Sequence, residues 1–255
     1  MHDRNKVSFS HFEKTFKALE LIASAAEPLT VSSLASQLSM GQARTGELLE
    51  FLVKRGFLEE DKESGSYRTG VRCISFAQIV NNNLTVLKYA RPIMQSLEKE
   101  HDEAVYIAVL KETEVIFLDM VDSEQPVKAP ALLGRSFPFF SNAAGKVIAA
   151  CEPRDYLHRY LQKVGRKRPA VDLEHLQQEL ISIRNSGVAV DNGGLGEQIT
   201  SVAVAIRDYA GKVLGALTLI GPTARMVGER LEREIIPSMV AGTQMLSARF
   251  GYAAP

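Results

Sequence analysis

The stretch SNAAGKVIAA, residues 141–150, contains the Gly145-Lys146 pair that is typical of phosphate-binding loops. A P-loop also needs a glycine five positions before Gly145 and a Ser or Thr directly after the lysine, to bind magnesium. Phe140 and Val147 occupy those two positions. The stretch therefore does not predict a nucleotide-phosphate site.

The same stretch supports a different chemistry, because it begins a predicted helix near Ala143. The first backbone amides of a helix have no partners inside the helix, and they attract anions. The amides from Asn142 through Ala143 to Ala144 are thus candidate ligands for a carboxylate. Alternatively, the side chain of Ser141 or Asn142 caps the helix. The sequence leaves both interpretations open.

Other chemical motifs are incomplete. NGGLGEQI, residues 192–199, resembles a dinucleotide-binding loop, but Ile199 replaces the third glycine and no helix follows, so a hairpin loop is predicted. The five histidines and two cysteines show no spacing typical of a catalytic triad or a metal site. We therefore expect no enzyme activity, no metal and no cofactor.

Composition limits the class of protein. The chain has 255 residues, of which 45% are hydrophobic, and a formal net charge of zero. It can form one large or two modest domains, and it has no overall attraction to polyanions. Its N-terminus, MHDRNKVSFSHFEK, is polar and no apolar run is long enough to span a membrane. These features predict a cytoplasmic protein without membrane association.

The first third of the chain predicts three helices and a hairpin. Helices are expected over 12–23, from Val31 and over 42–55, separated by Pro28 and Gly41. Gly56 occupies a C-cap position, and a hairpin follows with Gly65 in its turn. This order is that of a winged helix-turn-helix.

The remainder predicts an α+β fold. A connector helix is expected from Leu84 to Leu97, with Pro92 inside it. Polar turns then separate segments of strand and helix character, which predicts an antiparallel sheet with helices. Expected strands cover 104–109, 115–118, 188–190, 199–206 and 213–220. Expected helices cover 143–150, 155–162 and 173–184, and a final helix carries a stripe of Val227, Leu231, Ile235 and Met239.

The third helix would enter the major groove of DNA with its first turn. Glutamine pairs well with adenine and arginine with guanine. The predicted base-contacting residues are Gln42, Ala43, Arg44 and Thr45. The wing residues Lys62, Tyr67 and Arg68 are expected at phosphates or in the minor groove, and Lys14 of the first helix at the DNA backbone. Residues 1–72 contain ten Lys or Arg and ten Asp or Glu, so affinity would depend on where the cations lie and on dimerisation.

At the level of the whole chain, the sequence resembles the IclR family of bacterial transcriptional regulators. The resemblance depends on the order and spacing of many segments: FEKTFKALELI, EPLTVSSLASQLSM, LLEFLVKRGFLEED, SGSYRTG, LGRSFPFFSNAAGKVIAA, IRNSGVAVD and VAVAIRDYAGKVLGALTLIGP. It implies a winged helix-turn-helix domain (1–76), a connector helix (77–100) and a GAF-like effector-binding domain (101–255). It also implies a homodimer or a dimer of dimers (homotetramer).

The family resemblance further implies operator DNA and a small organic-acid effector as partners. It places effector contacts at the 142–144 stretch and at Phe137, Asp191, Ser201, Thr218 and Ile220. The expected mechanism is that the acid shifts the effector domain between conformations, and the connector changes the spacing of two winged helices.

Two segments depart from the family pattern. Glu47 stands where the family usually has an arginine directly before a leucine pair, and Gly46 precedes it. Asn192-Gly193-Gly194 replaces an acidic pair, which predicts a flexible loop. Because of the first departure, a protein-binding module with a degenerate helix-turn-helix remains one alternative to a DNA-binding regulator. An enzyme of the C-terminal domain is the other alternative.

Overall fold

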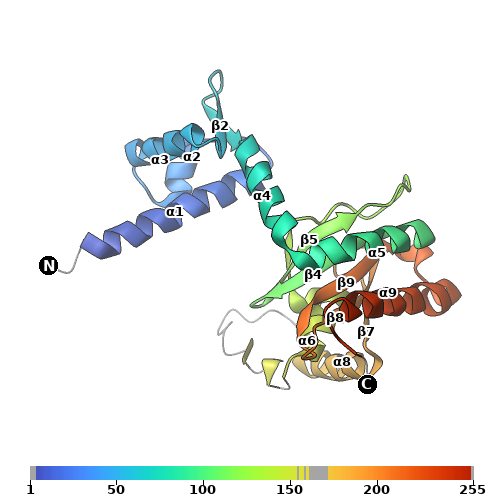
Figure 1. Ribbon diagram of the computed structural model, residues 1–255. Helices are drawn as coiled ribbons and strands as arrows, with labels where there is room; N and C mark the ends of the chain where they lie inside the picture. The colour runs from blue at the N-terminus through green and yellow to red at the C-terminus, as the bar shows by residue number, and fades with distance from the viewer. Residues whose placement is uncertain (1–3, 154, 158, 161–171, 254–255) are drawn as a thin grey trace. The chain divides into compact units, whose positions relative to one another are not determined.

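A computed structural model describes residues 4–153, 155–157, 159–160 and 172–253. The chain divides into two compact units, residues 1–84 and 85–255 (Figure 1). None of the helices in the described ranges has both the length and the apolar character that crossing a bilayer requires.

The N-terminal unit consists of helices and a small sheet. Leu34, Leu49 and Leu58 are fully or almost fully buried and form its core with the inner face of the first helix. The antiparallel sheet has the strand order β1-β3-β2. Its elements are α1 (Arg4–Ser24), β1 (Leu29–Thr30), α2 (Val31–Leu38), α3 (Gln42–Lys54), β2 (Leu58–Asp61), β3 (Ser66–Thr69) and α4 (Val71–Asn83).

Capping residues determine where these helices begin and end. Thr30 and Ser33 form a reciprocal capping box at the start of α2. Ser39 ends α2 with a left-handed backbone (φ 50°), and Gly41 is the N-cap of α3. Gly65 has a φ of 63°, which confirms that the hairpin turn needs a residue with positive φ.

The segment between the hairpin and the second unit forms two helices where the sequence analysis expects one connector over 77–100. Helix α4 ends at Asn83, and α5 (Thr85–His101) begins after Leu84. Three consecutive asparagines precede the break, and asparagine is a poor helix former. Pro92 lies inside α5 and does not end it.

The C-terminal unit has a six-stranded antiparallel sheet, which confirms the predicted α+β class. Its strand order is β6-β5-β4-β9-β8-β7. The strands are β4 (Ala104–Lys111), β5 (Glu114–Val121), β6 (Ser136–Pro138), β7 (Val188–Asn192), β8 (Ile199–Arg207) and β9 (Val213–Pro222). The sequence analysis missed β6, because three residues are too few for a periodic signal.

Helices cover both faces of this sheet (Figure 1). Helix α6 (Ala143–Cys151) packs on β4, β9, β8 and β7, with α8 (Leu173–Ser186) beyond it. Helices α5 and α9 (Ile236–Ala248) pack against β4, β5, β8 and β9. On the α6 face many positions are alanine, so the helix approaches the strands closely: Ala104, Ala108, Ala189, Ala203, Ala205 and Ala216.

Two predicted helices differ in detail. The helix expected over 155–162 lies partly outside the described residues. In the last helix, residues Arg230–Ile235 form a π-helix, whose wider turn interrupts the 3.6-residue spacing. Val227 precedes this helix and is 51% exposed, so it is not part of the predicted stripe.

Candidate functional site

The first turn of α3 presents polar side chains to solvent. Gln42, Ala43 and Arg44 are all exposed, as the sequence analysis expects, and Gly41 adds no capping side chain in front of them. Gln42 Nε2 lies 3.5 Å from Ser32 Oγ of α2, so its amide stays close to the helix-turn-helix. The Gln42 amide and the Arg44 guanidinium are exposed groups of the kind that recognise base edges.

Two predicted contacts in this unit need correction. Thr45 is fully buried, and its Oγ1 donates a hydrogen bond to the Gly41 carbonyl (3.1 Å). It follows Arg44 directly and points into the core, about 100° around the helix from Arg44's exposed side chain, so it cannot reach a base. Tyr67 is 7% exposed and packs in the core of the unit, where its hydroxyl donates to Glu60 (3.2 Å). Tyr67 therefore stabilises the wing.

The other predicted cations lie on the surface. Lys14 Nζ donates to the Ser39 carbonyl (3.1 Å), which ties α1 to the turn between α2 and α3. Lys62 is exposed in the hairpin turn. Arg68 pairs with Glu59 across the hairpin (3.0 Å), but both side chains are exposed, so this pair contributes little to stability. It leaves the guanidinium accessible to a phosphate.

The predicted effector residues meet on the α6 face of the C-terminal sheet. Strand register places Asp191 opposite Ser201, and Ser201 opposite Ile220. Thr218 lies two residues before Ile220 on β9 and faces the same side. Ser201, Thr218 and Ile220 are each at most 1% exposed. A polar Ser and Thr at such depth need partners.

The N-terminus of α6 lies against this group of residues. Asn142 is the N-cap, and its Oδ1 accepts a hydrogen bond from the Gly145 amide (2.9 Å). The Ala143 amide donates to Ser201 Oγ across a long 3.4 Å contact. Side-chain capping, one of the two interpretations left open above, is thus confirmed. The sequence analysis expected a free amide at Ala143, but this amide is bonded to Ser201. Ala144 lies buried between Ala143 and Gly145, whose amides are both bonded.

Phe137 approaches the same face from β6. Its ring makes an edge contact with Phe117 (5.9 Å between centroids), and the Arg135 guanidinium lies 5.1 Å from its centroid. Phe137 is half-buried and packs against the core cluster that also contains Ala143 and Ala144. It forms an aromatic border to the face.

Lys146 is a residue that the sequence analysis tested only as part of a P-loop. Its Nζ bridges Asp191 Oδ2 (2.6 Å) and Glu179 Oε1 (2.9 Å), with its side chain only 10% exposed. Burial by itself lowers the pKa of Lys146, but hydrogen bonds to Asp191 and Glu179 outweigh burial and raise that pKa above its ordinary value. Lys146 is therefore a buried cation at neutral pH that joins α6, α8 and β7.

The second oxygen of Asp191 is also occupied. Asp191 Oδ1 accepts a hydrogen bond from the Gly194 amide (3.0 Å). Gly193 has a φ of 90°, and a Cβ on Gly194 would lie 1.6 Å from the Ser141 carbonyl oxygen. The glycines therefore let this loop pack directly on the start of α6. In place of the flexible loop expected from sequence, the structure has one fixed by specific contacts, and Asp191 is part of its support.

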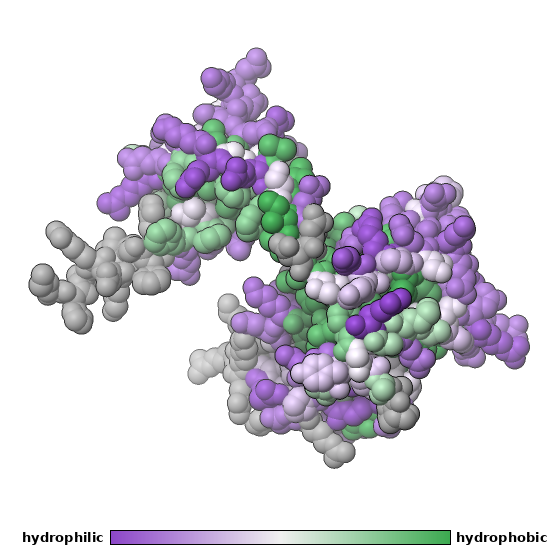
Figure 2. All heavy atoms as spheres, viewed as in Figure 1, coloured by the Kyte–Doolittle hydropathy of each residue, from purple (hydrophilic) through white to green (hydrophobic). Residues whose placement is uncertain are grey.

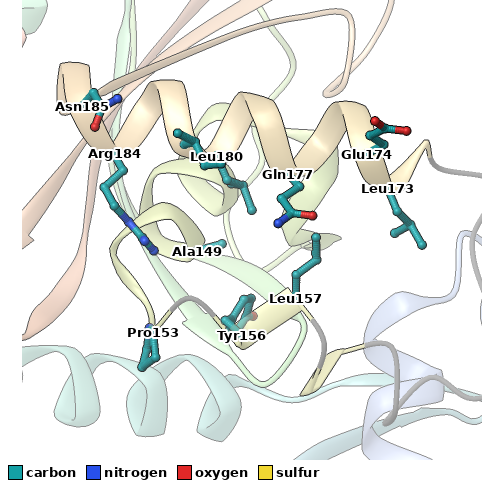
Figure 3. A pocket seen from close by; sticks show the side chains of 11 residues that line it. Ala149, Pro153, Tyr156, Leu157, Leu173, Glu174, Gln177, Leu180, Arg184 and Asn185 are labelled. Atoms are coloured by element: carbon teal, nitrogen blue, oxygen red, sulfur yellow. The ribbon is translucent and has the colours of Figure 1, made fainter.

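Two pockets flank this part of the unit. One of about 360 Å³ is bordered by Lys146, Glu179, Asp191 and His175. A larger one of about 710 Å³ lies between α6 and α8, lined by apolar Leu157, Leu173 and Leu180 (Figure 3). Arg184 at its edge donates to the carbonyls of Ala150 and Glu152 (both 2.6 Å), so its guanidinium caps the end of α6.

No group of His, Cys, Asp and Glu side chains suited to a metal ion occurs within the described ranges. The carboxylates of the two most buried ion-pair groups there are already paired, Asp191 and Glu179 with Lys146, and Glu103 with two nitrogens of Arg225.

Two family models match the chain. "IclR helix-turn-helix domain" matches residues 12–62, and "Bacterial transcriptional regulator IclR C-terminal" matches residues 78–248. The HTH-type transcriptional regulator KdgR of Escherichia coli (strain K12) is 25% identical over 254 residues, which cover 98% of this chain and 96% of that protein. KipR of Bacillus subtilis (strain 168), another HTH-type transcriptional regulator, is 27% identical over 208 residues, covering 80% and 82% of the two chains.

Solved structures share the fold across both units. The Thermotoga maritima IclR structure matches with a TM-score of 0.75 at 25% identity, covering 96% of this chain and 100% of that one. An IclR homolog from Microbacterium hydrocarbonoxydans, crystallised with 4-hydroxybenzoate, matches with a TM-score of 0.78 at 20% identity, covering 95% and 100%.

We expect Lys146→Met to destabilise the C-terminal unit by about 3–5 kcal/mol, because it leaves the largely buried carboxylate of Asp191 and the half-buried carboxylate of Glu179 without their cation. Lys128→Met is the matched control, since Lys128 pairs with Asp122 at an exposed position, and it should cost at most about 1 kcal/mol. Chemical denaturation of the full chain measures both. Equal losses for the two variants would contradict the structural role of Lys146.

Proposed function

The chain belongs to the IclR family of bacterial transcriptional regulators, and from this premise we propose that it regulates transcription in response to a small organic acid. The observation that carries the proposal is the presence, in one chain, of an exposed recognition turn and a buried polar face at the start of α6. The curated relatives are regulators, which supports a non-enzymatic role.

In this proposal, the first turn of α3 reads the operator. Gln42 and Arg44 contact base edges, Ala43 approaches a thymine methyl, and Lys62 and Arg68 of the wing contact phosphates. Lys14 positions the helix-turn-helix through its bond to Ser39. Glu47 is exposed on the same helix, and its negative charge repels DNA phosphates. The affinity for DNA therefore depends on the few cations that face the DNA.

The effector binds at the α6 face of the C-terminal sheet. Its carboxylate lies near the α6 N-terminus at Asn142–Ala144, beside Ser201, where the helix dipole favours a negative charge. Phe137, Thr218 and Ile220 border the rest of the ligand. Asp191, with both oxygens occupied, positions the 191–194 loop and does not contact the ligand directly.

A homodimer, or a dimer of dimers, supplies the two recognition helices that a palindromic operator needs. Helix α4 supports this assembly, because several of its large apolar residues are exposed, and Figure 2 shows apolar residues gathered over this helix on the viewed face. Exposed apolar side chains that lie close together commonly mark a protein–protein contact. The exposed residues are Val71, Ile74, Phe76, Ile79 and Val80, each 42% exposed or more. A second copy of this chain would cover them in the cytoplasm.

We expect Arg44→Ala to weaken operator binding by about 1–3 kcal/mol, roughly 5- to 150-fold in Kd, because a bidentate contact to guanine is lost. Arg55→Ala is the control, since Arg55 is an equally exposed arginine at the far end of the same helix. Fluorescence anisotropy with operator DNA measures both. Unchanged affinity for Arg44→Ala would favour the alternative in which this domain binds a protein.

We expect Ile79→Asp to shift the chain toward monomer, because a carboxylate would be buried without a partner in the interface. Ile79 is 61% exposed in the single chain, so the change should leave each unit folded. Gln78→Asp places the same charge on the neighbouring exposed position and should leave the assembly intact. Sedimentation equilibrium distinguishes the two, and an unaltered mass for Ile79→Asp would place the interface elsewhere.

A further inference from the structure

The recognition helix α3 carries a carboxylate without a partner. Glu47 is exposed, and its side chain makes neither an ion pair nor a hydrogen bond with any described residue. The next carboxylate of the helix, Glu50, pairs with Lys54 (2.7 Å). Glu59 of the hairpin likewise pairs with Arg68 (3.0 Å). The side chain of Glu47 is therefore available to another molecule.

Glu47 lies at the middle of the exposed face of α3. The buried residues of this helix are Thr45, Leu48, Leu49 and Leu52. Successive residues are about 100° apart around a helix, which places Ala43 and Glu47 on one line opposite the buried side. Both residues are exposed. When a recognition helix lies in the major groove, this line faces the base edges, and the two sides of the helix face the phosphates.

Two small residues lie beside Glu47 on this face. Ala43 precedes it by one helical turn, and Gly46 precedes it directly. A Cβ on Gly46 would meet no atom within 4 Å, and its φ is not positive, so neither packing nor backbone geometry requires glycine there. Glycine weakens a helix, and it is useful where another molecule approaches the backbone closely. Ala43 and Gly46 thus allow the start of α3 to lie deep in the groove, within reach of Glu47 to a base.

DNA limits where a carboxylate can lie. Phosphates repel it, so its favourable neighbours are hydrogen-bond donors on base edges. In the major groove, guanine presents two acceptors and thymine presents an acceptor and a methyl group. Adenine presents a donor beside an acceptor, whereas cytosine presents only a donor, its N4 amino group. Cytosine is therefore the base that a carboxylate at this position favours.

Arg44 lies close enough to Glu47 for the two residues to read neighbouring base pairs. They are three residues apart, which is about 4.5 Å along the helix axis. Adjacent base pairs are about 3.4 Å apart. The two side chains do not pair with each other in the described part of the chain, so both charged groups remain available. A guanine contacted by Arg44 would thus have a cytosine contacted by Glu47 beside it.

We propose that Glu47 is a specificity-determining residue, which accepts a hydrogen bond from the N4 amino group of a cytosine next to the guanine that Arg44 contacts. This role rests on the proposed DNA-reading function, because it requires α3 to lie in the major groove. The carboxylate then has two effects. It weakens binding to sequences that present an acceptor at this position, and it stabilises binding to the one that presents a donor.

The test begins with selection of randomised duplexes by the wild-type full chain. Duplexes of about 30 base pairs are long enough for two half-sites one helical turn apart. The selected sequence should contain one C·G pair beside the guanine in each half-site. In fluorescence anisotropy, changing this pair to T·A or G·C should weaken wild-type binding about 5- to 150-fold. In Glu47→Ala the same changes should no longer alter the affinity, while the preferences at all other base pairs remain.

Two further variants identify the cause of the preference. Glu47→Gln keeps the shape of the side chain but has an amide, which pairs with adenine, so the preferred base should change from cytosine to adenine. Glu50→Ala is the matched control, because it removes the same charge from the same exposed face, three residues along the helix. It should keep the preference for cytosine.

If Glu47→Ala raises the affinity for every duplex by the same factor and keeps the wild-type base preferences, Glu47 acts only by repulsion. That result, or a selected sequence without a C·G pair beside the guanine, overturns the inference and leaves the proposed function standing. Loss of the cytosine preference in Glu50→Ala also overturns it, because the cause is then net charge. If the wild type enriches no duplex, DNA reading itself fails, and the role of Glu47 fails with it.

Discussion

The close packing of α6 on the sheet is the constraint on which the C-terminal unit depends. All its residues from Ala143 to Ala150 are buried, including Lys146. A side chain on Gly145 would lie 2.2 Å from the Phe139 carbonyl oxygen, so that position admits only glycine. Because alanines line the opposing strands, the helix approaches closely enough for its first amide to reach Ser201. The polar face exists only because of this approach.

The packing of α6 on the sheet also explains why its buried charged residues have a structural role. Lys146, Asp191 and Glu179 satisfy one another and connect three elements, and Asp191 also fixes the loop at Gly194. Burying these charges as a network avoids the large cost of an isolated ion. We therefore assign a structural role to the ionic groups.

Local sequence signals predicted much of the fold. Apolar segments located five of the six strands of the C-terminal sheet, and Gly56 and Gly65 marked a helix end and a turn whose geometry depends on neighbouring residues only. The site was less predictable. Thr45 and Tyr67 have polar groups that suit DNA contact, yet tertiary packing buries both. The partners of Lys146 are 33 and 45 residues away, a pairing that no local pattern encodes.

The central claim is that residues 31–60 form a reader of DNA whose affinity depends on a few well-placed cations. The most direct measurement is selection of bound fragments from the source genome by the purified full chain, followed by binding of the selected site at several salt concentrations. The account predicts a defined, near-palindromic site whose affinity falls steeply as salt rises. Failure to enrich any site with folded protein, with and without candidate acids, would contradict it.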